Sequence, residues 1–284
     1  MTLRRFRFGV SFTSVGTRAG WDQRVREAAG LGYDVLQVPD HLGMVAPFPA
    51  MAAAAEAADI RVGTYVLNAG VLRPGYLARD VADLHRLTGG RFELGLGTGY
   101  VPAEYEAAGV PFGTPADRLR RLETLVRATR ELLAAEPDRP RPPLMLAGAG
   151  RQVLSFAARE ADIVSFPVTV HFAATGDPEE PLASRVALVR EAAGDRFDQL
   201  ELNLFVAGVG DSVSDLDLSV IAQASGKSPE EIARTPGVLA GSPQEIADRL
   251  LRYREEYGIS YVSVLEDHLP AFAKVIPLLR EAGQ

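Results

Sequence analysis

The chain has 284 residues, of which 47% are hydrophobic and 24% are charged, and its formal net charge is −7. These values are those of an ordinary globular protein, and the length suits one β/α barrel of about 250 residues. The acidic balance argues against a nucleic-acid partner, the lack of cysteine excludes disulfides and thiolate chemistry, and no apolar run approaches a membrane span.

Strands and amphipathic helices alternate from the N-terminus. The opening MTLRRFRFGVSF runs from its arginines into a strand over 6–12 without a signal-type core, which predicts a cytoplasmic protein. Trp21, Val25 and Ala28 then mark one helical face, which Gly32 closes. The next expected elements are a strand over 35–38, a helix over 51–58, a strand over 60–67, a helix over 77–84 and a strand over 92–96.

The second half continues the alternation. A helix over 115–133 opens with Thr114 as N-cap and Pro115 at its first position, and the Pro-rich connector 136–143 follows. Four more strands are expected at 144–146, 163–166, 200–206 and 259–265, with a capping-box helix start at Ser242 before the last. Eight strands separated by helices favour an α/β fold, a (β/α)8 TIM barrel that forms a single domain over 1–284.

Two segments, 167–183 and 208–241, do not fit the simple strand–helix unit, and both follow a strand. In a barrel such insertions lie on the catalytic face and shape the substrate pocket. The alternative is a surface excursion without function, and for the charged run 177–180 that alternative is favoured.

The stretch PLMLAGAGRQVLSFAAREAD at 143–162 is typical of an anion site. An apolar strand passes through Gly148, Ala149 and Gly150 directly into an amphipathic helix that Arg151 begins. Backbone N–H groups at such a helix start, together with its dipole, favour a phosphate, and an arginine adds forked donors. The alternative is a tight turn without a ligand.

Polar residues follow the expected strand ends, where barrel enzymes hold their chemistry. His41 is the strongest candidate for proton transfer, because imidazole titrates near neutrality and the adjacent Asp40 can orient it or hold charge. A capped turn with a partly buried histidine is the alternative. The other groups at these ends are Ser11, Thr13, Asn68, Thr98, Gly99, Tyr100, the 148–151 loop and Glu266–His268.

The other histidines offer weaker signals. His85 falls within a helical pattern and His171 within an insertion, so both are interpreted as incidental, whereas His268 is left open. No two histidines have a helical metal-ligand spacing, and we predict no metal site.

Gly95, Gly97 and Gly99 alternate along one strand, so that one face of it carries no side chains. Such a face admits a flat ring or another stretch of backbone. Glu93 shares the face and is interpreted as an ion-pair partner, for example of Arg61. Tyr100 and Glu104 follow in the loop and, with Phe12, are expected to line the substrate pocket; a rim or surface position is the alternative for the first two.

Six stretches together resemble a known family: PDHL at 39–42, VGTYVLNAG at 62–70, residues 73–100, EYEAAGVPF at 104–112, residues 142–164 and residues 239–264. They look like the luciferase-like flavin and deazaflavin oxidoreductases, most like the branch that depends on coenzyme F420. Two departures are visible: Arg73-Pro74 stands where the family commonly has His-Pro, and the phosphate loop has fewer glycines.

The resemblance implies a β/α barrel with a non-proline cis peptide at the bulge ending the third strand, near Leu67-Asn68. It implies a flavin or deazaflavin ring against that bulge, near Gly97, Thr98 and Gly99, with the cofactor phosphate at Gly148–Arg151 and Asp40-His41 beside the ring. A homodimer through 50–58 and 76–88 is expected on the same basis.

The function favoured at this stage is F420-dependent hydride transfer to or from a small-molecule substrate, with no nucleic-acid or membrane partner. An FMN-dependent monooxygenase is the first alternative. A catalytically inactive flavin-binding or partner-binding barrel is the second.

Overall fold

The computed structural model describes residues 4–135, 141–167, 180–219, 222 and 228–282. The chain divides into two compact units. We call residues 11–29 and 35–148 the first unit, and residues 1–10, 30–34 and 149–284 the second unit. His171 and most of 167–183 lie outside the described residues.

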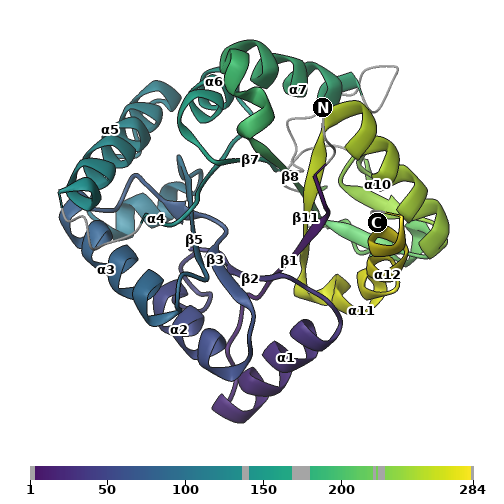
Figure 1. The fold of residues 1–284 in the computed structure, drawn as a ribbon. Helices are drawn as coiled ribbons and strands as arrows, with labels where there is room; N and C mark the ends of the chain where they lie inside the picture. Colours follow the sequence, from purple (N-terminus) through teal and green to yellow (C-terminus); the bar gives the residue numbers. More distant parts are fainter. Residues whose placement is uncertain (1–3, 136–140, 168–179, 220–221, 223–227, 283–284) are drawn as a thin grey trace. The chain divides into compact units, whose positions relative to one another are not determined.

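The first unit alternates strands with helices. Its parallel strands pair in the order β2–β3–β5–β6, and the short β4 adds to β5. Figure 1 shows α2, α3 and α5 on the outer side of these strands. The elements are α1 (Arg18–Gly30), β2 (Val35–Val38), α2 (Pro47–Ala57), β3 (Arg61–Thr64), β4 (Leu67–Asn68), α3 (Pro74–Leu87), β5 (Phe92–Gly97), α4 (Pro102–Ala107), α5 (Pro115–Ala134) and β6 (Leu144–Ala147).

In the second unit β7 pairs in parallel with β8, and β8 pairs in parallel with β11. Its helices and strands are α6 (Arg151–Glu160), β7 (Ile163–Phe166), α7 (Glu180–Ala193), β8 (Glu201–Val206), β9 (Gly208–Gly210), α9 (Pro229–Ala233), β10 (Val238–Ala240), α10 (Pro243–Tyr257), β11 (Ile259–Leu265), α11 (Leu269–Ala273) and α12 (Ile276–Glu281). Short 3-10 turns lie at Gly194–Gln199, Val213–Asp215 and Glu266–His268.

In the first unit β3 also pairs with β5, and β1 covers Arg7–Ser11. Strands that alternate with helices along the chain, with β3 and β4 as the two pieces of the third strand, give the (β/α)8 barrel fold that the sequence predicts. β2, β5 and β7 are buried along their whole length, as expected for parallel strands covered on both faces.

The expected helix starts are confirmed at two positions. Thr114 and Asp117 form a reciprocal capping box at the start of α5, with Pro115 at the first position. Ser242 and Glu245 do the same for α10, which ends at Gly258 in the left-handed conformation. These caps satisfy backbone N–H groups that a helix start leaves without partners.

The structure corrects two sequence-based boundaries. The expected strand over 60–67 is broken into β3 and β4, and α4 forms where only a loop was expected. The 208–241 segment contains the parallel pair β9–β10. It also has a small apolar cluster of its own, made of Leu218, Ile232 and Val238.

Candidate functional site

Two side chains of the first unit contact the imidazole of His41. The Nδ1 of His41 lies 2.8 Å from the Oε1 of Glu104, and the hydroxyl of Tyr100 lies 3.2 Å from its Nε2. His41 follows the end of β2, whereas Tyr100 and Glu104 come from the β5–α4 segment. The cluster therefore joins two strand ends that are distant in sequence.

The partner on Nδ1 decides which nitrogen of His41 can exchange a proton. An ionised carboxylate only accepts hydrogen bonds, so Nδ1 carries a hydrogen whenever it bonds Glu104. The same Oε1 also accepts from the backbone N–H of Leu42 at 3.2 Å. Proton exchange is thereby left to Nε2, the nitrogen that meets Tyr100.

Asp40 does not orient His41, contrary to expectation. Its Oδ2 accepts from the backbone N–H of Asn68 at 3.1 Å and so ties the end of β2 to the bulge after β3. Burial is the largest influence on the carboxyl of Asp40 and raises its pKa, and the nearby charge of Glu104 raises it too. The Asn68 amide and His41 lower the pKa, but the net shift is upward. Glu104 performs the orienting role, because its position after Pro102 in the first turn of α4 brings it to the imidazole.

The bulge after β3 contains the expected non-proline cis peptide, although two residues earlier than predicted. The cis bond joins Tyr65 and Val66 rather than Leu67 and Asn68. Beyond it, Leu67 and Asn68 pair with Leu96 and Gly97 of β5. The Oδ1 of Asn68 accepts from the N–H of Gly70, whereas its buried Nδ2 has no partner among the described residues.

The glycine row at 95, 97 and 99, which runs from β5 into the loop after it, accommodates the chain itself. A Cβ at Gly95 would overlap the carbonyl oxygen of Thr64, and one at Gly97 would lie 2.8 Å from a methyl group of Val66. At Gly99 it would overlap the side chain of Asn68. Of the two possibilities that the sequence left open for this face, a flat ring or another stretch of the chain, the contacts at these glycines are made by the chain's own bulge. Backbone contacts from Gly97, Thr98 and Gly99 to a cofactor stay a prediction.

The 148–151 loop connects β6 to α6. Gly150 is the N-cap of α6 with φ −79° and ψ 146°, and no side chain caps this helix start. A Cβ at Gly150 would meet nothing within 4 Å. Neither backbone conformation nor packing within the described protein requires glycine there, which agrees with space kept for a ligand. Arg151 is exposed at the first position of α6.

Phe12 lies apart from the His41 cluster. Its ring is buried, packs edge-on against Trp21 with centroids 5.7 Å apart and is covered by the guanidinium of Arg24. These contacts make it a core residue, and the expected pocket-lining role is not supported. Ser11 is likewise buried.

The remaining singled-out residues have structural partners. Glu93 pairs with Arg61 at 2.7 Å, as the sequence predicts. His85 is buried in α3, where burial lowers its pKa. His268, left open by the sequence, contacts the carbonyl oxygen of Ala207 through Nε2 at 2.9 Å. Within the described ranges, no three His, Cys, Asp or Glu side chains gather in a way that could hold a metal ion.

A sequence model of the family described as "Luciferase-like monooxygenase" matches residues 17–209 of the chain. The 4-hydroxyprotoasukamycin monooxygenase of Streptomyces nodosus subsp. asukaensis is 33% identical over 111 residues, which are 37% of this chain and 29% of that protein. The chain spans between 29% and 50% of the length of the curated relatives it matches.

Solved structures show the same fold. An F420-dependent secondary alcohol dehydrogenase in complex with an F420–acetone adduct has a TM-score of 0.78 and 16% identity, covering 98% of this chain and 100% of that one. EDTA monooxygenase from Chelativorans sp. BNC1 has a TM-score of 0.78 and 17% identity, covering 99% and 94%. Across the part of the chain that the structure describes, no helix has the length and apolar character needed to cross a membrane.

Proposed function

This chain belongs to the luciferase-like monooxygenase family, and from that premise we propose an oxidoreductase that depends on coenzyme F420. It transfers a hydride between the deazaflavin and an unsaturated C=C, C=N or C=O carbon of a small organic substrate. The observation that carries the proposal is the His41–Glu104 pair at 2.8 Å, which leaves one imidazole nitrogen to move a proton.

The chemistry divides between cofactor and protein. Reduced F420, when bound, supplies the hydride. A carbonyl or imine that accepts a hydride becomes basic and must gain a proton. His41 donates that proton from Nε2, because Glu104 retains the hydrogen on Nδ1, and in the reverse oxidation Nε2 accepts it. The hydroxyl of Tyr100 lies 3.2 Å from this Nε2, within hydrogen-bonding distance of it.

Two features of the described residues fit such a cofactor. The buried Nδ2 of Asn68 at the bulge has no partner and would donate to a carbonyl of the ring edge, since buried polar groups are normally hydrogen-bonded. Gly150 and Arg151 would hold the phosphate, with the uncapped start of α6 supplying N–H donors.

An FMN-dependent monooxygenase is the second candidate. The sequence match to a Streptomyces monooxygenase and the structural likeness to EDTA monooxygenase favour it. In that case the same Asn68 and Gly150 positions would hold the flavin, and a separate reductase would be needed.

Parallel fluorescence titrations with F420 and with FMN test the proposal. We expect F420 to bind at least about tenfold more tightly, a difference of about 1.4 kcal/mol, and reduced F420 to be oxidised in the presence of carbonyl or enone substrates. Tighter binding of FMN than of F420 would favour the FMN-dependent monooxygenase instead. Cofactor binding without any turnover would indicate the inactive barrel, and binding of neither cofactor would overturn all three.

We also propose that the protein acts in the cytoplasm as a homodimer through the helices near 50–58 and 76–88. Tyr76 and Leu87 are exposed on α3, which supports an apolar contact there. Light scattering on the purified protein tests the dimer.

A further inference from the structure

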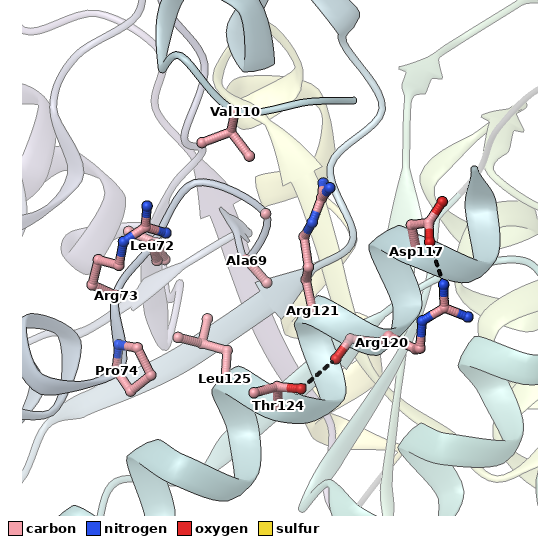
Figure 2. A pocket seen from close by; sticks show the side chains of 11 residues that line it. Ala69, Leu72, Arg73, Pro74, Val110, Asp117, Arg120, Arg121, Thr124 and Leu125 are labelled. Carbon is pink, nitrogen blue, oxygen red and sulfur yellow. Dashed lines mark hydrogen bonds and ion pairs between the residues drawn. The ribbon is translucent and has the colours of Figure 1, made fainter. Parts of the chain in front are cut away.

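The first unit has a pocket that none of the His41, Tyr100 and Glu104 side chains lines. It has a volume of about 400 Å³, within the range of small-molecule sites. Its walls come from the loop after β4, the start of α3 at Arg73-Pro74, Val110 before α5, and the first turns of α5 (Figure 2).

The pocket is rich in arginine although the chain is acidic. Figure 2 shows Arg73 and Arg121 on opposite sides of Ala69, with Arg120 turned away toward Asp117. Arg120 and Asp117 form an ion pair, so that their charges offset each other. Arg73 has no hydrogen-bond or ion-pair partner among the described residues. Among the described residues Arg121 forms no ion pair, and its polar partners are neutral: the carbonyl oxygen of Phe112 and the side chain of Tyr105.

Two guanidinium groups that form no ion pair among the described residues favour an anion, and apolar side chains beside them favour an organic one. Leu72, Val110 and Leu125 supply that apolar surface. We propose that this pocket binds a small organic anion that carries a carboxylate or a phosphate, held between Arg73 and Arg121 with its carbon skeleton against Leu72 and Leu125.

Tyr105 packs beside the pocket. Gly70 lines the pocket, and the hydroxyl end of Tyr105 occupies the space where a side chain at Gly70 would lie. The same hydroxyl donates to the carbonyl oxygen of Thr98 at 2.6 Å. Neither His41 nor Tyr100 lines the pocket, so the proposal does not depend on the proposed function.

Calorimetric titration of the full chain at low ionic strength, with succinate and with inorganic phosphate as probes, tests the site. Arg73→Ala is the principal variant, because Arg73 has no partner whose loss would affect folding, and Arg121→Gln is the second. Arg127→Ala is the matched control, since Arg127 is exposed on the same helix as Arg121 and does not line the pocket. Arg151→Ala tests whether phosphate binds at the 148–151 loop instead.

We expect the parent to bind succinate and Arg73→Ala to bind it about tenfold more weakly, with Arg127→Ala unchanged. For inorganic phosphate, which the 148–151 loop is also proposed to hold, we expect Arg73→Ala and Arg151→Ala each to weaken a separate binding event. The stronger of the two probes identifies the anion as carboxylate or phosphate. The proposal is overturned if neither probe binds the parent, if Arg73→Ala binds as the parent does, or if only Arg151→Ala loses binding.

Discussion

The Nδ1 of His41 and the Oε1 of Glu104 lie 2.8 Å apart although the residues are separated by 63 positions in the sequence. The contact fixes the hydrogen on one imidazole nitrogen and presents the other to Tyr100. In the proposed mechanism this leaves Nε2 as the atom of His41 that exchanges a proton. The carboxylate of the adjacent Asp40 accepts instead from the Asn68 amide.

Replacing His41 with Gln should retain cofactor binding and lower kcat by about 10² to 10⁴, the usual contribution of a positioned acid or base. Glutamine keeps some hydrogen bonding but cannot titrate. Stopped-flow turnover on the cofactor-loaded variant measures the effect. Full turnover of the variant would mean that His41 has only a structural role in the turn after β2. Weaker cofactor binding with normal turnover of the bound fraction would mean that His41 holds the cofactor ring.

Glu104→Gln should lower kcat by about tenfold or more with little change in substrate KM, because a neutral amide no longer fixes the Nδ1 hydrogen or stabilises the imidazolium. Glu106→Gln is the control, since Glu106 is exposed on the same helix. Nitrogen NMR of the His41 ring checks the cause, as the two tautomers have different spectra. Equal kinetics for the two variants would remove Glu104 from the mechanism.

Gly150→Asp should weaken cofactor binding several-fold or more, at about 1.4 kcal/mol per tenfold, because it places a negative charge where a phosphate is proposed. The space around Gly150 is open, so the variant should fold normally. Gly150→Asn has nearly the same shape without the charge and serves as the control. Unchanged titration curves for a folded Gly150→Asp would exclude this loop from the site.

Asp40→Asn should stabilise the protein increasingly as the pH rises. Burial raises the folded-state pKa of Asp40 above 3.8. The contribution of Asp40 to the free energy of unfolding is therefore fully present below that pH, and it is lost as the pH rises through the folded-state pKa. Asparagine still accepts from the Asn68 amide and carries no charge. Thermal unfolding at about pH 4 and about pH 7 should show a larger Tm gain at the higher pH; a gain that does not vary with pH would contradict the assignment.

Gly95→Ala should destabilise the fold by about 1 to 3 kcal/mol, the usual penalty for overpacking, because the added methyl group overlaps the Thr64 carbonyl oxygen. Gly150→Ala adds the same methyl group in open space and should change stability by less than about 1 kcal/mol. Urea unfolding of the two variants compares them directly. Equal midpoints would mean that the bulge relaxes at little cost.

Local pattern was enough to predict the eight strands of the barrel and the Thr114 and Ser242 caps, because each depends on neighbours within a few residues. It also identified the Arg61–Glu93 pair, since an inward carboxylate in a barrel requires a cation. The break between β3 and β4 was missed because 60–67 contains no proline and is rich in β-branched and aromatic residues, which favour one continuous strand.

The site was predicted as a set of positions but not as a set of contacts. His41, Tyr100 and Glu104 were all singled out, yet Glu104 was assigned to the pocket wall, because its partner lies on a different strand and sequence spacing carries no information on that distance. The acidic residue in the first turn after Pro102 was the available signal. The Gly95–Gly99 row was interpreted correctly as a site of close approach, and what approaches is the chain's own bulge.

Four glycines limit which positions of this protein can be varied. A randomised library that includes positions 70, 95, 97 or 99 would lose most members before selection, because each lacks room for even one methyl group. Position 150 has that room, and its neighbour Arg151 is exposed. Diversity intended to change the proposed phosphate contact is therefore best placed at 150 and 151, with the glycines at 70, 95, 97 and 99 left unchanged.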